Sequence, residues 1–168
     1  MRKLLLHVCC APCSTSVIEQ LEKDYHITLF FYNPNIHPLR EQLFRQKETE
    51  RYAKQSGLEV LLDKGDIKKW MQMVDGVKWA TEKSGRRCEL CYRDRLYSVA
   101  RKASEQGFDI FASTLTVSPY KHTEMINRLG LEAERKFSVE YLTSDFKKMD
   151  GFKRSVLLSK KYSMYRQD

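Results

Sequence analysis

The sequence predicts an α/β fold, a single domain with a mostly parallel sheet. Strand-like apolar runs alternate with segments of helical spacing, which is typical of parallel α/β sheets. The chain has 168 residues, of which 42% are hydrophobic, enough for one core and hardly for two. It contains only 7 Gly and 4 Pro, and no linker divides it. We therefore expect residues 1–168 to form one metal-binding catalytic domain, for the reasons that follow.

The first half of the chain opens on an apolar run at 3–8 that is typical of a buried strand. The Asn33-Pro34-Asn35 turn ends the second strand, Gly57 is the expected stop of a charged helix, and Asp66 can cap a short helix. In order, we expect a strand at 3–8, a helix at 14–23, a strand at 27–32, a helix at 38–57, a strand at 58–62 and a helix that carries Trp70, Met73 and Val74.

The second half begins with a segment at 75–87 that has no clear period and reads as a loop or lid. Beyond it, the pattern Leu96, Val99, Ala100, Ala103 continues a helix to Gly107. We then expect a strand at 108–113, a helix at 121–129 opened by Ser118-Pro119-Tyr120, a strand at 137–142, and a last helix at 151–162 with Val156 and Leu157 facing inward.

Hydropathy excludes a membrane-spanning protein. The longest apolar runs, Leu4-Leu5-Leu6 and 27–32, fall far short of the roughly 20 residues that a spanning helix needs. His7 and two cysteines end the first run before it reaches the roughly 7–15 apolar residues of a signal peptide. We expect a cytoplasmic protein without a membrane partner.

The charge balance favours a polyanionic partner. Lys and Arg number 30 against 22 Asp and Glu, a formal net charge of +8, and a basic balance favours nucleic acid through counterion release. A solvated basic helix face is the alternative. The candidate phosphate-binding residues are Arg86, Arg87, Arg93, Lys147, Lys148, Lys153 and Arg154.

All five cysteines fall into two clusters, Cys9-Cys10-Ala-Pro-Cys13 and Cys88-Glu-Leu-Cys91. The first follows a strand and precedes a helix, where backbone N–H groups favour thiolates. On a helix, Cys88 and Cys91 at i and i+3 face the same way and can grip one metal centre. Four thiolates suit zinc or an iron–sulfur cluster, and the spacing leaves both open. Cys9 and Cys10 are expected on opposite faces, if the strand continues, and to serve different metals.

Two other functions fit part of this pattern. Cys10-Ala-Pro-Cys13 is also typical of a thioredoxin-like dithiol oxidoreductase, with Ser118-Pro119 as its facing cis-proline. A structural-zinc, tRNA-binding module would use the same cysteines without redox chemistry. A lone His7 on a strand is expected to be a core histidine more often than a ligand, and the segment 113–122 is either a polar binding edge or an ordinary helix cap.

Seven motifs, in this order, resemble the cobalamin-independent epoxyqueuosine reductase family, the QueH type. They are His7-Val-Cys-Cys-Ala-Pro-Cys13, Tyr32-Asn-Pro-Asn35, Arg87-Cys-Glu-Leu-Cys-Tyr92, Arg95-Leu96, Ser118-Pro-Tyr-Lys121, Asp145-Phe-Lys147 and Tyr165-Arg-Gln167. The resemblance implies reductive removal of the epoxide oxygen from epoxyqueuosine at the wobble position of tRNA, the last step of queuosine synthesis. It also implies a fold similar to the ATP-pyrophosphatase-like (adenine nucleotide alpha hydrolase-like) group, although the turn at 9–14 lacks the glycines of a phosphate loop.

The resemblance further implies an iron–sulfur cofactor and an external electron donor. Cys9, Cys10, Cys88 and Cys91, with Cys13, are the expected ligands of a 4Fe–4S cluster and of an additional mononuclear iron. Asp145, Tyr120 and Lys121 are the candidate proton donors. The family pattern continues past Tyr165-Arg-Gln167 into a Tyr-Cys-Gly-Cys segment, whereas this sequence ends at Asp168.

Overall fold

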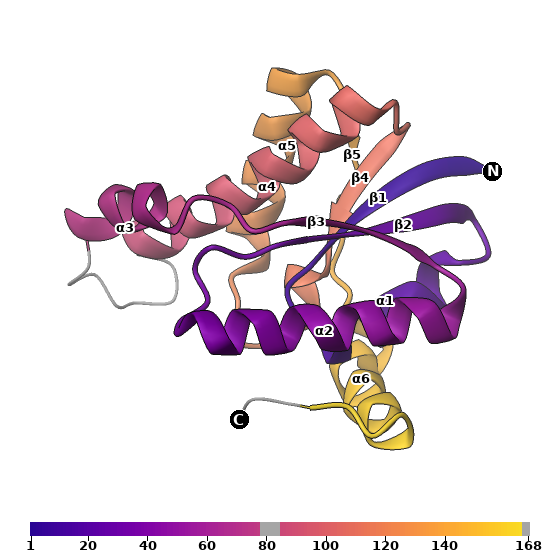
Figure 1. Cartoon of the computed structure of the whole chain (residues 1–168). Helices are drawn as coiled ribbons and strands as arrows, with labels where there is room; N and C mark the ends of the chain where they lie inside the picture. Colours follow the sequence, from indigo (N-terminus) through magenta and orange to yellow (C-terminus); the bar gives the residue numbers. More distant parts are fainter. Residues whose placement is uncertain (78–84, 166–168) are drawn as a thin grey trace.

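Five strands form one parallel sheet in the order β3-β2-β1-β4-β5 (Figure 1). The computed structural model describes residues 1–77 and 85–165 of the chain. The strands are β1 (Arg2–Val8), β2 (Tyr25–Tyr32), β3 (Glu59–Asp63), β4 (Ile110–Ser113) and β5 (Glu140–Tyr141). β1 lies at the centre because its apolar run is buried on both faces, as parallel sheets require.

Helices cover both faces of the sheet. Side chains alternate along β1, so Leu5 packs under α4 and α5 on one face, and Leu4 and Leu6 pack under α1 and α2 on the other. α6 packs against α1, and α3 against α4. The helices are α1 (Ala11–Leu21), α2 (Leu39–Ser56), α3 (Ile67–Asp75), α4 (Arg86–Gln106), α5 (Thr123–Phe137) and α6 (Gly151–Lys161), with short 3₁₀ turns η1 (Thr114–Val117) and η2 (Lys148–Asp150).

The strand order creates a switch point beside β1. The chain builds outward from β1 through β2 to β3 and then returns to place β4 on the other side of β1. In open α/β sheets, ligands bind at such a point, outside the carboxyl ends of the strands. The predicted α/β class with a parallel sheet is confirmed, and the edge formed by the ends of β1, β2 and β4 is the place to look for a site.

The helix ends follow the expected signals. Gly57 and Gly107 adopt left-handed φ values of 69° and 75° and end α2 and α4, a conformation that glycine takes without steric cost. The Asp66 carboxylate accepts a hydrogen bond of 3.0 Å from the Lys69 N–H and caps α3. These residues fix where each helix begins or ends relative to the sheet.

The predicted boundary between the fifth helix and the fifth strand is wrong. α5 continues to Phe137, which was expected in the strand, and β5 has only two residues. His122 starts the helix by accepting a hydrogen bond from the Met125 N–H through Nδ1, and Ser138 ends it in a left-handed conformation. The ring of Phe137 packs on Tyr97 of α4, with centroids 5.6 Å apart. This contact favours helix over strand at Phe137.

The predicted inward face of the last helix is also wrong by one residue. Leu157 is 53% exposed, whereas Leu158 is 4% exposed. α6 begins at Gly151 and packs on α1 through Ser155 and Ser159, small side chains that share the face of Leu158. When a helix packs through small polar residues, two adjacent apolar residues do not reveal which of them faces inward.

The expected loop or lid at 75–87 falls partly outside the described residues. α3 ends at Asp75, and α4 begins at Arg86. Residues 78–84 lie outside the described residues. Within the described ranges, no helix has both the length and the apolar character that crossing a membrane requires.

Replacing Gly130 with alanine should destabilise the fold. An added Cβ would overlap the ring of Tyr141, which is 4% exposed and is held by a 2.8 Å hydrogen bond to Asn127. Overpacking of about 1–3 kcal/mol should exceed the helix-propensity gain of about 1 kcal/mol. We expect a net loss of up to about 2 kcal/mol in the free energy of unfolding, measured by urea denaturation. The control is Gly76→Ala, because a Cβ added there would have no atom within 4 Å. Equal stability of the two variants would contradict the packing argument.

Candidate functional site

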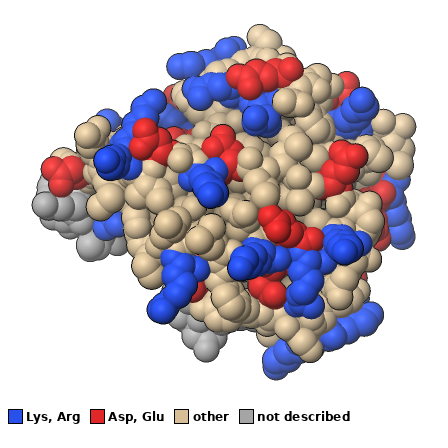
Figure 2. Space-filling view, viewed as in Figure 1, with Lys and Arg blue, Asp and Glu red and all other residues tan. Residues whose placement is uncertain are grey.

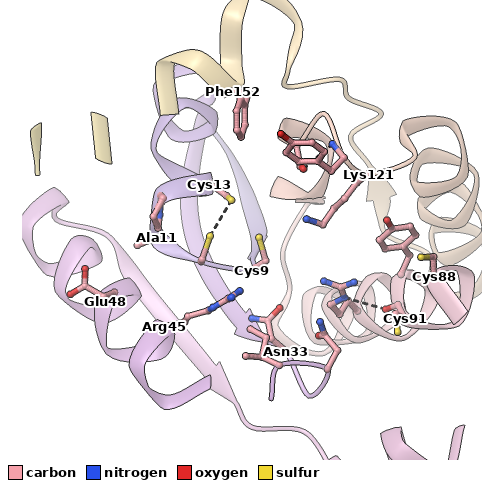
Figure 3. Close-up of a pocket in the computed structure, with 18 of the residues that line it drawn as sticks. Cys9, Ala11, Cys13, Asn33, Arg45, Glu48, Cys88, Cys91, Lys121 and Phe152 are labelled. Atoms are coloured by element: carbon pink, nitrogen blue, oxygen red, sulfur yellow. Dashed lines mark hydrogen bonds between the residues drawn. The ribbon is translucent and has the colours of Figure 1, made fainter. Parts of the chain in front are cut away.

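One cavity of about 760 Å³ opens at the carboxyl edge of the sheet (Figure 3). The turn at 9–13 after β1, the turn at 33–36 after β2 and the loop at 118–121 after η1 form part of its wall. The N-terminal half of α4 contributes Cys88 and Cys91 from the opposite side. The volume is in the range of small-molecule sites, roughly 300–1,000 Å³.

The cysteine turn gathers three thiols at this edge. β1 ends at Val8, Cys10 precedes α1 in an extended conformation, and Pro12 lies in the first turn of the helix. The Sγ atoms of Cys9, Cys10 and Cys13 all lie within 4.8 Å of one another, and the Cys10 and Cys13 sulfurs are 3.0 Å apart. Opposite directions for Cys9 and Cys10 were expected only if the strand continued, and β1 ends before them, so their side chains converge.

The electrostatics of this turn favour a thiolate. Hydrogen bonds from Cys10 and Cys13 hold the pKa of the Cys9 thiol well below its usual range, and the positive charge of Lys121 lowers it further. For Cys10, the contact with Cys13 lowers the pKa, but the contact with Cys9 and burial outweigh it and raise the pKa to about 12. The three-cysteine group therefore loses one proton readily. Loss of further protons is unfavourable unless a cation is bound.

Cys88 and Cys91 lie one helical turn apart on α4 and line the same cavity as the three-cysteine group. Figure 3 shows them across the cavity from Cys9 and Cys13. Burial raises the pKa of the Cys91 thiol. Soft thiolate ligands suit zinc and iron–sulfur centres, so three convergent thiols that face two more across a cavity fit a thiolate-bound metal.

His7 is a core histidine. Its Nδ1 lies 3.0 Å from the Ser113 hydroxyl and its Nε2 lies 3.0 Å from the Tyr32 carbonyl oxygen. Burial, together with the nearby charge of Arg95, lowers its pKa to about 4. A neutral imidazole with both nitrogens engaged ties β1 to β2 and β4, and it is not among the residues that line the cavity.

Two of the three candidate proton donors reach the cavity. Tyr120 and Lys121 line it, and Figure 3 shows the Lys121 side chain extending into the space between the cysteine turn and α4. Tyr120 is 75% exposed. Asp145 is not among the lining residues, and its carboxylate pairs with Lys147 at 2.9 Å.

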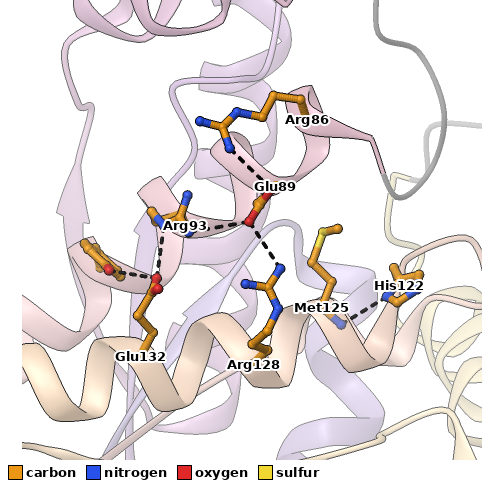
Figure 4. A network of polar contacts seen from close by, with 8 residues as sticks. Arg86, Glu89, Arg93, His122, Met125, Arg128 and Glu132 are labelled. Atoms are coloured by element: carbon orange, nitrogen blue, oxygen red, sulfur yellow. Dashed lines mark hydrogen bonds and ion pairs between the residues drawn. The ribbon is translucent and has the colours of Figure 1, made fainter.

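Most of the candidate phosphate-binding residues lie in surface ion pairs. Arg86, Arg93 and Arg128 surround the single carboxylate of Glu89 at 3.8, 3.5 and 3.2 Å (Figure 4). Arg93 also pairs with Glu132 of α5 at 3.0 Å, so this network fastens α4 to α5. Lys147 and Arg154 pair with Asp145 and Glu19. On the face in Figure 2, Lys and Arg are interspersed with Asp and Glu. Arg87 is the one of the seven candidates that lines the cavity.

Sequence reasoning missed several lining residues. Arg45 and Glu48 of α2 face the cavity, although the pattern of this charged helix does not single them out. Phe152 at the start of α6 completes the wall. No sequence pattern marks these residues, because α2 and α6 reach the site through their packing on α1. The motif residues Asn33, Asn35, Arg95 and Tyr165 also line it.

Comparison with known proteins gives a family across nearly the whole chain. Residues 4–168 match the family model described as epoxyqueuosine reductase QueH. The chain is 40% identical to epoxyqueuosine reductase QueH of Streptococcus pyogenes serotype M1, with 98% of this chain and 66% of the relative covered. Identity to the QueH of Staphylococcus aureus is also 40%, covering 98% and 72%. The chain thus spans about two thirds of the length of these relatives.

Two solved structures share the fold. A predicted subunit of tRNA methyltransferase from Methanocaldococcus jannaschii has a TM-score of 0.60 at 17% identity, covering 94% of this chain and 74% of that one. The U34-tRNA thiolase NcsA from Methanococcus maripaludis, with its 4Fe-4S cluster, has a TM-score of 0.60 at 12% identity, covering 99% and 59%. At such identities the likeness concerns the fold alone. The family match over residues 4–168 and the relatives at 40% identity establish that the chain belongs to the epoxyqueuosine reductase QueH family.

Proposed function

We propose that this chain, as one catalytic domain over residues 1–168, reduces epoxyqueuosine in tRNA to queuosine. The observation that carries the proposal is the convergence of Cys9, Cys10 and Cys13 inside a cavity that Lys121 also enters. Family membership supplies the reaction, because the relatives are named epoxyqueuosine reductase. The cavity supplies thiols for an electron-carrying metal and an amine for a proton at the same edge of the sheet.

The five cysteines fit an iron–sulfur cofactor. Cys9, Cys10 and Cys13 from one wall, with Cys88 and Cys91 from the other, would hold a 4Fe–4S cluster and, through the thiol in excess of four, an additional mononuclear iron. When bound, such iron supplies electrons one at a time and polarises an oxygen atom as a Lewis acid. NcsA carries its 4Fe-4S cluster on the same fold, but the argument for this chain depends on its own thiols.

The proposed reaction needs protons as well as electrons. Reduction of the epoxide to an alkene consumes two electrons from an external donor and two protons, and the oxygen leaves as water. A positioned acid lowers the barrier as negative charge develops on that oxygen. Lys121 is the best placed of the three candidates, because it extends into the cavity and its charge is felt by Cys9. Asp145 is already paired with Lys147.

The proposed substrate fits the charge of the chain. A net charge of +8 favours a polyanion such as tRNA. Arg87 lines the cavity, and Lys148 and Lys153 are exposed near Phe152. In the described part of the chain, these two lysines have no carboxylate within ion-pair distance. We propose that these cations contact phosphates. Arg86, Arg93, Lys147 and Arg154 would exchange their present carboxylate partners for phosphates on binding.

The thioredoxin-like alternative is not supported. The sheet is fully parallel, and the cis peptide bond within the described ranges precedes Pro38 rather than Pro119. The family match covers Cys88 and Cys91 as well as the Cys10–Cys13 pair, and a dithiol mechanism gives these two no role.

Serine in place of Cys13 or Cys91 should lower the iron content and abolish the reduction of epoxyqueuosine. Each variant loses a thiolate ligand, and a hydroxyl is a poor substitute for iron–sulfur binding. Iron and sulfide content of anaerobically purified protein, and mass spectrometry of nucleosides from tRNA treated with the protein and a chemical reductant, measure the two effects. Met71→Ala, 54% exposed on α3, is the control. Full activity of Cys91→Ser would instead support dithiol chemistry at Cys10 and Cys13.

Replacing Lys121 with methionine should lower kcat by about 10²- to 10⁴-fold, the usual contribution of a positioned acid. Methionine keeps a long unbranched side chain, one atom shorter than that of lysine, and removes the proton. Single-turnover conversion of the modified nucleoside measures the effect, with iron content checked in the same sample. Lys47→Met on the exposed face of α2 is the matched control. A rate unchanged in Lys121→Met but reduced in Asp145→Asn would assign the proton to Asp145.

A further inference from the structure

Three cavity-lining residues contain a buried polar atom without a hydrogen-bond partner. Within residues 1–77 and 85–165, five side-chain atoms are buried in this way, and three belong to Asn33, Asn35 and Trp70. Burying a polar group without a partner is costly, and such groups are rare in stable folds. Of these three atoms, one that no protein group contacts is a candidate for a contact with a ligand.

The Trp70 atom has a counterpart nearby. Its indole N–H lies close enough to Cys91 to lower the pKa of that thiol, against the larger effect of burial. The other two atoms are the asparagine oxygens. Both come from the turn that follows β2, at the edge of the cavity where Figure 3 shows Asn33.

The orientation of Asn33 is set by the protein. Its side chain is 1% exposed, and its Nδ2 donates a hydrogen bond of 2.9 Å to the carbonyl oxygen of Val8, which fixes the amide oxygen on the other side. The buried ring of His7, whose two nitrogens contact Tyr32 and Ser113, also interacts with the Asn33 side chain. Asn33 therefore ties the turn to β1, and the amide without a protein partner is that of Asn35.

Asn35 is not held by any such bond. Its amide makes no hydrogen bond to the described residues, and its Oδ1 is buried. A hydroxyl group both donates and accepts, so it satisfies an amide in either orientation. The turn therefore offers the Asn35 amide to a ligand that carries a hydroxyl group.

We propose that Asn35, on the turn that Asn33 ties to β1, binds a hydroxyl group on the carbocyclic ring of the modified base. The inference rests on the proposed function, because it takes epoxyqueuosine as the ligand. The turn binds this ring at the carboxyl edge of the sheet, beside the cysteine turn that follows β1. A site that hydrogen-bonds a hydroxyl discriminates strongly against a base that lacks it, so Asn35 determines specificity for the modified nucleotide.

The test compares the affinity of the protein for two RNAs. One is tRNA that carries epoxyqueuosine, and the other is the same tRNA with unmodified guanosine at that position. Their Kd values are measured by fluorescence anisotropy with anaerobically purified protein. We expect the wild-type protein to prefer the modified tRNA, and Asn35→Leu to lose at least about fivefold of that preference while it binds unmodified tRNA as before.

Stability gives a second readout that separates binding from folding. Because Asn35 has no partner to lose, Asn35→Leu should keep or raise the Tm. The matched control is Asn127→Leu outside the cavity, since Asn127 accepts from Tyr141 and donates to Ser144 at 2.8 Å each. That variant should lower the Tm and leave the preference for modified tRNA unchanged. Asn33→Leu also leaves Val8 without a donor, so Asn35→Leu carries the test.

The outcomes separate this inference from the proposed function. If the wild-type protein prefers the modified tRNA and Asn35→Leu keeps the full preference, the subsite is overturned and the proposed function stands. If wild-type protein binds both RNAs equally, recognition of the hydroxyl groups is overturned. The proposed function is then tested independently by the conversion assay. If it binds neither RNA, both proposals fail.

Discussion

The parallel pairing of the strands is the constraint on which the site depends. Because all five strands run in one direction, their carboxyl ends meet at one edge of the sheet. The turns after β1 and β2 and the loop beyond β4 are therefore brought together, although they are separated by many residues in sequence. The apolar interior of β1, with Leu4, Leu5 and Leu6 fully buried, holds that edge rigid. Function then depends on which side chains these turns carry.

At this edge the chain places groups that are costly to bury alone. Three thiols lie within 4.8 Å of one another, Arg95 is 5% exposed in the wall that α4 forms, and the buried Asn35 oxygen lacks a donor. Each is unfavourable in an empty protein and favourable with a cation or a polar ligand present. The same features that lower stability indicate what the cavity binds.

The sequence predicted the alternation of strands and helices well, because strong signals mark it. The apolar run of β1, Gly57, Gly107 and the Asp66 cap each act locally, so their effect can be read without the fold. Phe137 and Leu157 were misplaced because the deciding contacts are tertiary: Phe137 packs on Tyr97, and α6 meets α1 through small serines. Local pattern cannot rank such alternatives.

The site was predictable in its chemistry and not in its geometry. Clustered cysteines and ordered motifs identified the thiols, Tyr120 and Lys121, all of which line the cavity. The sequence predicted that the strand ends at Val8, but it did not reveal that the turn beyond it brings the sulfurs of Cys9 and Cys10 together. Nor did it reveal that Arg45 and Glu48 reach the cavity from α2, or that Asp145 is occupied by Lys147.

The central claim is that the convergent thiols form a redox metal centre. The most direct measurement is the iron, sulfide and zinc content of anaerobically purified wild-type protein, with its visible absorption spectrum from the same sample. The account predicts roughly four iron and four sulfide per chain, or iron in excess of sulfide if a mononuclear site is filled, and a brown chromophore. A colourless protein with stoichiometric zinc and no iron would contradict it and would assign the cysteines to a structural site.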